Sequence, residues 1–195
     1  MSFVGCDFFQ EEAKLLQAID GCDVIVHCAG PFQGLRDAPV LKAVLDDRLT
    51  VRPKVYCDVC DDAELAMEAK AAYAEEARRK GVAAVLSTGT WPGASSLLAV
   101  ELKQLLKTKY DAQLDRLKFN FFTSGSGGAG ATVLAATFLI LSEDARTYVN
   151  NKRVDKETCS DAKDVCFAGV GEKEVRRLNL LEAWSAHEFL GVPNT

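Results

Sequence analysis

The sequence predicts an α/β fold in which a doubly wound parallel sheet is followed by part of an α+β domain. Three observations predict it. In the first half, short β-branched segments alternate with segments of helical periodicity, and Gly or Pro follows most of them. The chain has 195 residues, 48% of them hydrophobic, which is enough to bury a core. Short strands joined by helical crossovers favour a parallel sheet with helices on both faces.

The elements of the first half follow from periodicity and from their end signals. Apolar residues at helical spacing predict helices at 11–19, 38–45 and 62–80. Gly21 and Gly81 end the first and the third of these helices. Apolar, β-branched runs predict strands at 23–29, 54–59 and 82–87, and a further short strand at 3–6.

The second half has a different pattern. Its expected elements are a helix at 95–106, an alternating strand at 117–122, a Gly-rich turn at 124–130, an apolar helix at 132–141 and short strands up to Thr195. The sheet type therefore changes, and we expect two domains, at residues 1–93 and 94–195. The second is too short to be complete.

Composition excludes several classes of function. A net charge of -5 and a pI near 5.2 argue against a nucleic-acid partner. No apolar run approaches the roughly 20 residues that span a bilayer, which argues against a membrane partner. Seven cysteines without a signal peptide predict reduced thiols in a soluble intracellular protein.

The ends of the three longer predicted strands carry unusual residues. Ligands of open parallel sheets bind outside the carboxyl ends of the strands. The residues there are Ala29-Gly30-Pro31-Phe32, then Tyr56, Asp58, Asp61 and Asp62, then Thr88-Gly89-Thr90-Trp91-Pro92-Gly93. Gly leaves room for a flat ligand and Pro fixes the loop. Ordinary turns between strand and helix also use Gly and Pro, and for any single turn this alternative stays open.

Several motifs, in order along nearly the whole chain, resemble the saccharopine dehydrogenase-like oxidoreductases, particularly the plant and algal branch. They are Val26-His27-Cys28-Ala29-Gly30-Pro31-Phe32-Gln33, Tyr56-Cys57-Asp58-Val59-Cys60-Asp61-Asp62, Trp91-Pro92-Gly93-Ala94-Ser95, Gly125-Ser126-Gly127-Gly128-Ala129-Gly130, Leu178-Asn179-Leu180 and Ser185-Ala186-His187-Glu188. In this family a Rossmann-type first domain binds NAD(P), and a second domain holds substrate and dimer contacts. Its characterised members form or cleave secondary amines by hydride transfer.

The resemblance implies a site for NADP or NAD, an amino-acid-type small-molecule substrate and a homodimer. The expected cofactor-binding residues are Asp7, Gly30, Pro31, Phe32, Thr88, Gly89, Trp91, Pro92 and Gly93. Asp58 is the candidate for proton handling, and Gly127 and Gly128 are candidates for a loop on the substrate side. Arg36 is a further substrate candidate, because a guanidinium can bind a carboxylate or phosphate with two hydrogen bonds. Cytoplasm and chloroplast both stay open as compartments.

The phosphate-binding fingerprint that begins such a domain is missing. Gly125-x-Gly127-x-x-Gly130 has the glycine spacing, but residues 147–153 after the next helix are polar and turn-like instead of forming a second buried strand. A genuine fingerprint would precede Asp7, where only six residues are available. We therefore expect a chain that starts inside the domain, with weak or no cofactor binding and little activity. The alternative is a non-catalytic remnant that acts as an interaction or dimerisation subunit.

Other chemistry-bearing residues give weaker indications. Cys57-x-x-Cys60 has no second paired motif, so no metal is predicted, and buried thiols are the expected outcome. His27 lies in a predicted strand, where a role in the core or at the sheet end competes with catalysis. The absence of a G-x-S-x-G elbow weighs against a hydrolase.

Overall fold

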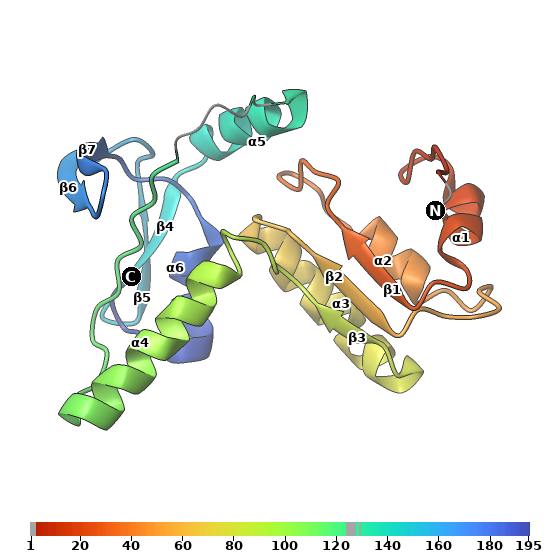
Figure 1. The fold of residues 1–195 in the computed structure, drawn as a ribbon, viewed down its shortest axis with the longest axis horizontal. Coiled ribbons are helices and arrows are strands. Elements are labelled where there is room, and N and C mark those ends of the chain that lie inside the picture. The colour runs from red at the N-terminus through yellow and green to blue at the C-terminus, as the bar shows by residue number, and fades with distance from the viewer. Residues whose placement is uncertain (1–2, 124–127, 129) are drawn as a thin grey trace. The chain divides into compact units, whose positions relative to one another are not determined.

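The structure of the chain is a computed structural model, and it describes residues 3–123, 128 and 130–195. The chain divides into two compact units, Met1–Gly89 and Thr90–Thr195, which we call unit 1 and unit 2 (Figure 1). The sequence-based boundary lies between residues 93 and 94. Both units mix helices and strands, so the fold is of the mixed α/β class.

Unit 1 contains a three-stranded parallel sheet with the strand order β1-β2-β3. Its elements are α1 (Glu12–Ile19), β1 (Val24–His27), α2 (Pro39–Val44), β2 (Val55–Asp58), α3 (Ala63–Lys80) and β3 (Ala83–Val85). The register pairs His27 with Asp58 and Cys57 with Val85. The parallel sheet of this half and its three alternating helices are confirmed.

The longest helix of unit 1 begins and ends at the residues that its sequence indicates. The Asp62 carboxylate accepts a hydrogen bond from the amide of Leu65 at 2.7 Å and caps the start of α3. Gly81 ends the helix with φ at 68°, a left-handed conformation that costs glycine little. Both ends of α3 are therefore determined locally.

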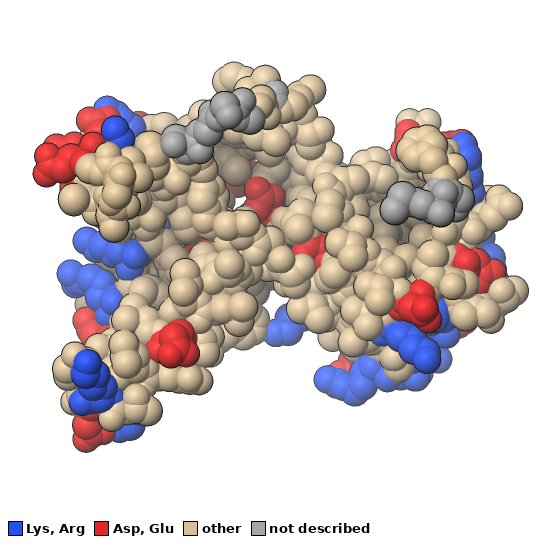
Figure 2. Space-filling model, viewed as in Figure 1, with Lys and Arg blue, Asp and Glu red and all other residues tan. Residues whose placement is uncertain are grey.

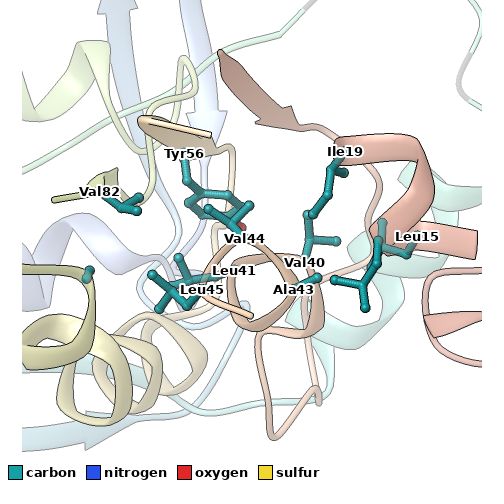
Figure 3. Close-up of a cluster of buried hydrophobic side chains, with 11 residues drawn as sticks. Leu15, Ile19, Val40, Leu41, Ala43, Val44, Leu45, Tyr56 and Val82 are labelled. Carbon is teal, nitrogen blue, oxygen red and sulfur yellow. The ribbon is translucent and has the colours of Figure 1, made fainter. Parts of the chain in front are cut away.

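The core of unit 1 lies on one face of the sheet, under α1, α2 and α3 (Figure 3). Its buried members are Leu15, Leu16, Ile19, Val40, Leu41, Ala43, Val44, Leu45, Tyr56, Ala77 and Val82. Tyr56 is 1% exposed, and its ring, which comes from the central strand β2, lies in this cluster. Burial of apolar surface is thus concentrated on a single side of the sheet.

The opposite face of the sheet differs from the expectation that helices cover both faces. Val24, Val26 and Val85 are 50%, 62% and 50% exposed. Right-handed crossovers that all advance in one direction, as in the order β1-β2-β3, place their helices on the same side. A doubly wound sheet needs crossovers in both directions. In the described residues of unit 1, the crossovers all run in the same direction.

The predicted strand at 3–6 is wrong. Phe3 is 95% exposed, and no strand is assigned before β1 in the described residues. The chain turns at Asp7 instead: its carboxylate accepts a hydrogen bond from the amide of Phe9 at 2.9 Å, and its carbonyl accepts one from Glu11 at 2.8 Å. This local turn leads directly into α1.

Unit 2 combines helices with two β-hairpins, β4–β5 and β6–β7. Its elements are α4 (Ala94–Tyr110), α5 (Ala131–Leu141), β4 (Ala145–Val149), β5 (Lys152–Lys156), β6 (Lys163–Phe167), β7 (Gly171–Val175) and α6 (Leu181–Leu190). Asn150 and Asn151 both have positive φ, at 51° and 64°, which is typical of a tight hairpin turn. Only residues 150–151 of the segment 147–153 form a turn. The prediction that 147–153 is turn-like throughout is wrong, because 147–149 belong to β4, in which Thr147 and Tyr148 are buried, and 152–153 belong to β5.

The predicted strand at 117–122 is also wrong. The only pairing there is an isolated bridge between Arg116 and Asn194, with the Leu117 amide donating to the Asn194 carbonyl at 3.0 Å. The side chains of residues 117–122 alternate, but within the described part of the chain no strand pairs with them. Leu117 instead joins the small core of unit 2, which also contains Ala99, Ala186 and Val192.

Two helices of unit 2, α4 and α5, carry apolar side chains that are largely exposed. No residue of α5 is buried, although nearly all of its side chains are apolar. On α4, Leu98, Leu102 and Leu105 form a stripe at spacings of four and three residues, and Leu98 is 71% exposed. Within the described residues, no helix combines the length and the apolar composition that crossing a membrane requires.

Charged side chains are paired at the basic end of α3. Lys80 lies 2.8 Å from both Asp47 and Glu76, Arg79 lies 3.6 Å from Glu76, and Arg78 pairs with Glu75. On the face shown in Figure 2, basic and acidic side chains occur in small interspersed groups. The basic cluster of the sequence is therefore a paired helix end, as its position before Gly81 indicates.

Truncation of the unit 1 core tests this arrangement. We expect Val44→Ala to lower the free energy of unfolding of unit 1 by about 2 kcal/mol, because Val44 is fully buried and two methyl groups leave the core. Val51→Ala, at a position 58% exposed, is the matched control and should cost less than about 0.5 kcal/mol. Native-state hydrogen exchange of the β1 and β2 amides measures both. Equal losses would contradict the assigned core.

Candidate functional site

The carboxyl ends of the three parallel strands form the candidate site of unit 1. His27 ends β1, Asp58 ends β2 opposite it, and Ser87 and Thr88 follow β3. In a parallel sheet these ends meet at one edge, where ligands of α/β proteins bind. Polar side chains from separate strands are thereby brought to one edge of the sheet.

The Asp58 carboxylate is the centre of this site and is only 4% exposed. Its Oδ2 accepts a hydrogen bond from the Tyr56 hydroxyl at 3.1 Å. Its Oδ1 accepts from the amides of Cys60 at 3.1 Å and Ser87 at 2.7 Å. Three donors therefore compensate for the burial of this carboxylate.

The backbone of Asp58 ties the same two strands together. Its carbonyl accepts hydrogen bonds from both the amide and the hydroxyl of Thr88, each at 2.7 Å. Ser87 has a φ of 62°, which is uncommon for a residue other than glycine. The chain after β3 is thus held in a turn against the end of β2.

His27 continues the hydrogen-bonded chain beyond Tyr56. Its Nδ1 lies 3.2 Å from the Tyr56 hydroxyl, and its side chain packs edge-on against Phe8 and Phe32, with ring centres 5.3 and 5.2 Å apart. The tyrosine has one hydroxyl hydrogen, which it donates to Asp58, so Nδ1 of His27 must be the donor to Tyr56. The other ring nitrogen, Nε2, is buried and has no hydrogen-bond partner among the described residues.

Burial sets the protonation states in this chain. Burial lowers the pKa of His27, and the negative charge of Asp58 opposes this shift in part. Burial, with the nearby Asp58 charge, raises the pKa of Tyr56, so the hydroxyl stays protonated. Because the folded-state pKa of His27 lies below its unfolded value of about 6.5, the unfolded chain binds the proton more readily. The His27 contribution to stability is present above that pH and decreases as the pH falls below it.

A small cavity adjoins this network. Its volume is about 10 Å³, and His27, Phe32, Tyr56, Asp58, Leu65 and Leu86 are among the residues that line it. This volume is close to the minimum that one water molecule needs. Its polar lining includes the side chains of the hydrogen-bonded chain and, in addition, Asp37.

Several of the predicted cofactor residues lie at this edge. Gly30, Pro31 and Phe32 follow β1, and the Gly30–Pro31 peptide bond is cis. The Phe32 ring is 5% exposed and packs against His27, so it supports the imidazole. Thr88 is bonded to Asp58, and Gly89 is the last residue of unit 1.

Two predicted residues of unit 1 lie on its surface. Asp7 is exposed in the turn before α1, with its carboxylate bonded to the amide of Phe9. The Arg36 side chain is 78% exposed, and its guanidinium lies 4.0 Å from the Glu68 carboxylate. Neither side chain has a hydrogen bond or ion pair to the Asp58 network in the described structure.

The remaining predicted residues belong to unit 2. Trp91 packs on Phe121 with ring centres 4.8 Å apart, Pro92 is fully buried, and Gly93 has a φ of 132° at the start of α4. Gly128 is exposed. Gly127 lies outside the described residues.

Sequence reasoning missed the chain from His27 through Tyr56 to Asp58. Tyr56-x-Asp58 spacing places two side chains on one face of a strand, which is a signal in the sequence. The alignment of His27 with Asp58 depends on the strand register, which this spacing does not give. Ser87 was missed because its contribution is a backbone amide.

The thiols of the Cys57-x-x-Cys60 motif are free, as are the other five cysteines. Cys60 is 2% exposed, and burial raises the pKa of its thiol. Among the described residues, no group of three or more His, Cys, Asp or Glu side chains is arranged to hold a metal ion.

Removal of the Asp58 carboxylate tests its central role. We expect Asp58→Ala to lower the free energy of unfolding of unit 1 by about 2–4 kcal/mol, because Tyr56, Cys60 and Ser87 lose their acceptor. Asp58→Asn keeps one oxygen acceptor and should lose less than half as much. Hydrogen exchange of the β2 and β3 amides reports unit 1, since both tryptophans, Trp91 and Trp184, lie in unit 2. A negligible loss in Asp58→Ala would show that the carboxylate does not hold these strand ends together.

The chain matches no model of a known protein family, and it matches none of the curated proteins. The relationship to the saccharopine dehydrogenase-like oxidoreductases therefore stays a prediction from its motifs. The function of the site is inferred from its geometry and chemistry.

Proposed function

We propose that unit 1 is the nicotinamide-side part of a Rossmann-type dinucleotide-binding sheet. In this proposal the protein is an NAD(P)-dependent oxidoreductase that acts on the CH–NH group of a secondary-amine amino acid. One observation carries it: the Gly30-Pro31-Phe32 loop, the buried Asp58 and the Thr88-Gly89 loop lie at the carboxyl edge of one parallel sheet. That edge is where open α/β sheets bind dinucleotides.

The loop after β1 supports a close approach of a ligand to the backbone. A Cβ added at Gly30 would meet the Phe32 ring at 3.5 Å, an ordinary van der Waals contact, so packing within the chain does not require glycine there. A ligand that contacts the backbone at this point would require it. The absence of a side chain at Gly30 therefore favours a binding role.

The network behind the loops supports a preorganised site. Asp58 holds Ser87 through one hydrogen bond and Thr88 through two, each at 2.7 Å. Loops held in this way need little ordering when a ligand binds, which lowers the cost of binding. A bound nicotinamide would supply the hydride, and the residues of the chain would supply position and electrostatics.

The proposal is tested by dinucleotide binding to the full chain. We expect NADPH or NADH to shift the amide resonances of residues 29–32 and 87–89 in a saturable manner. Gly30→Ala should raise the Kd about tenfold without loss of stability, because the new methyl group fits the free fold and obstructs the ligand. Gly130→Ala, where an added Cβ meets nothing within 4 Å, is the control and should leave the Kd unchanged.

Two outcomes would contradict the proposal. No saturable shift with either dinucleotide would remove the cofactor site. Equal weakening by Gly30→Ala and Gly130→Ala would show that the ligand does not approach the loop after β1. An effect of Gly130→Ala alone would move the site to the Gly-rich turn of unit 2.

A second candidate function is that of an interaction or dimerisation subunit. The exposed Leu98, Leu102 and Leu105 stripe of α4 and the mostly apolar α5 favour it, because helices with so much apolar surface are normally buried. The occupant in this proposal is a second copy of the chain. A homodimer is compatible with the oxidoreductase proposal as well.

Sedimentation velocity tests this second candidate. We expect the chain to sediment as a dimer and Leu98→Glu to sediment as a monomer, because a carboxylate in an apolar interface is costly. Lys107→Glu adds a carboxylate on the opposite side of α4 and should leave the dimer intact. If the wild-type chain stays monomeric at a protein concentration about 100 times that of the dinucleotide-binding assay, a stable homodimer through α4 is excluded.

A further inference from the structure

Among the described side chains of His27, Tyr56 and Asp58, one buried polar atom has no hydrogen-bond partner, and it is Nε2 of His27. Nδ1 donates to Tyr56, Tyr56 donates to Asp58, and Asp58 accepts from Ser87 and Cys60. Nε2 is buried with no hydrogen-bond partner among the described residues. Every other polar atom of the chain from Nδ1 to the carboxylate is satisfied.

The chemical character of Nε2 follows from the direction of the hydrogen bonds that run from His27 through Tyr56 to Asp58. A neutral imidazole carries one hydrogen, and the contact with Tyr56 assigns it to Nδ1, so Nε2 presents a lone pair. Protonation would place a positive charge in a buried site, and burial lowers the pKa of His27 accordingly. At neutral pH the nitrogen is therefore an acceptor and cannot donate.

A buried acceptor without a partner is unfavourable, and proteins normally satisfy it. His27 is 8% exposed and lines a cavity of about 10 Å³, whose other walls include the apolar side chains of Phe32, Leu65 and Leu86. This space suits the polar tip of one small group and no larger polar surface. The missing partner is therefore a single donor.

We propose that the cavity beside His27 binds one hydrogen-bond donor, the N–H or O–H group of a ligand, and that water takes this place in the free protein. Tyr56 and Asp58 are positioning residues that hold His27 in the tautomer with Nε2 as acceptor. The inference deepens the proposed function and rests on it for one point only, which is that the donor belongs to the amine substrate or its cofactor. A group that can only accept, such as a carboxylate, is excluded from this position.

The first test is the tautomer of His27, which does not depend on any dinucleotide. The chain has two histidines, so 15N-histidine labelling gives two sets of ring resonances, and His187→Gln assigns them. We expect His27 to be neutral with its hydrogen on Nδ1 at pH 7. Tyr56→Phe should shift the tautomer ratio toward Nε2–H by about fivefold or more, the factor that the loss of one hydrogen bond implies.

Tyr110→Phe is the control, because Tyr110 is 62% exposed at the end of α4 in unit 2 and does not line the cavity beside His27. It should leave the His27 resonances unchanged. The proposal would be overturned if His27 of the wild-type chain carried its hydrogen on Nε2 or were charged at pH 7. This outcome is measured on the wild-type chain and does not depend on whether Tyr56→Phe folds. An equal response to Tyr56→Phe and Tyr110→Phe would overturn the positioning role.

The second test compares formamide with formate, two probes of nearly equal size. Formamide offers N–H donors, whereas formate offers only acceptors at pH 7. We expect formamide to shift the His27 Nε2 resonance in a saturable manner and formate at the same concentration to have less than about one-tenth of that effect, the factor that 1.4 kcal/mol of discrimination gives. An equal response to formate would overturn the donor specificity. No response to either probe would overturn the binding site and assign the cavity to a structural water alone.

Discussion

The buried carboxylate of Asp58 is the interaction on which the carboxyl edge of the unit 1 sheet depends. Its oxygens accept from Tyr56 on its own strand, from the amide of Cys60 after it and from the amide of Ser87 beyond β3. A charge buried to this extent is stable only when donors surround it, so its position and that of the loop after β3 determine each other. Neither β2 nor β3 could shift by one residue without leaving these groups unpaired.

The same carboxylate determines the state of the imidazole on the neighbouring strand. Tyr56 has one hydrogen to donate, and because Asp58 receives it, His27 must donate from Nδ1. Phe8 and Phe32 pack edge-on against the ring and keep it from turning. Three polar residues on two strands thus behave as one unit, and Nε2 of His27 is its buried side-chain atom without a hydrogen-bond partner among the described residues.

The elements that sequence reasoning predicted well are those whose causes are local. The helices of unit 1 have apolar residues at helical spacing, an Asp62 cap or a Gly81 stop, and their bounds agree with the expected ones within about two residues. The strands at 3–6 and 117–122 failed for one reason: a strand needs a partner, and apolar alternation does not reveal whether one is present. Of the hairpin around Asn150 and Asn151, only the turn could be predicted from the sequence, because the residues of its two strands are mostly polar.

By itself, the sequence determined the α/β class, the helices of unit 1, the order of its strand segments and the strand ends that Gly30, Asp58 and Thr88 follow or occupy, because periodicity, capping and turn chemistry act over a few residues. It did not reveal α6, where short strands were expected. Only the tertiary structure decided the register that sets His27 beside Asp58, the one-sided cover of the sheet that leaves Val26 exposed, and the uncovered faces of α4 and α5. These depend on contacts between residues distant in the chain. Their free energy comes from burial and from hydrogen bonds across strands, which no short segment of sequence contains.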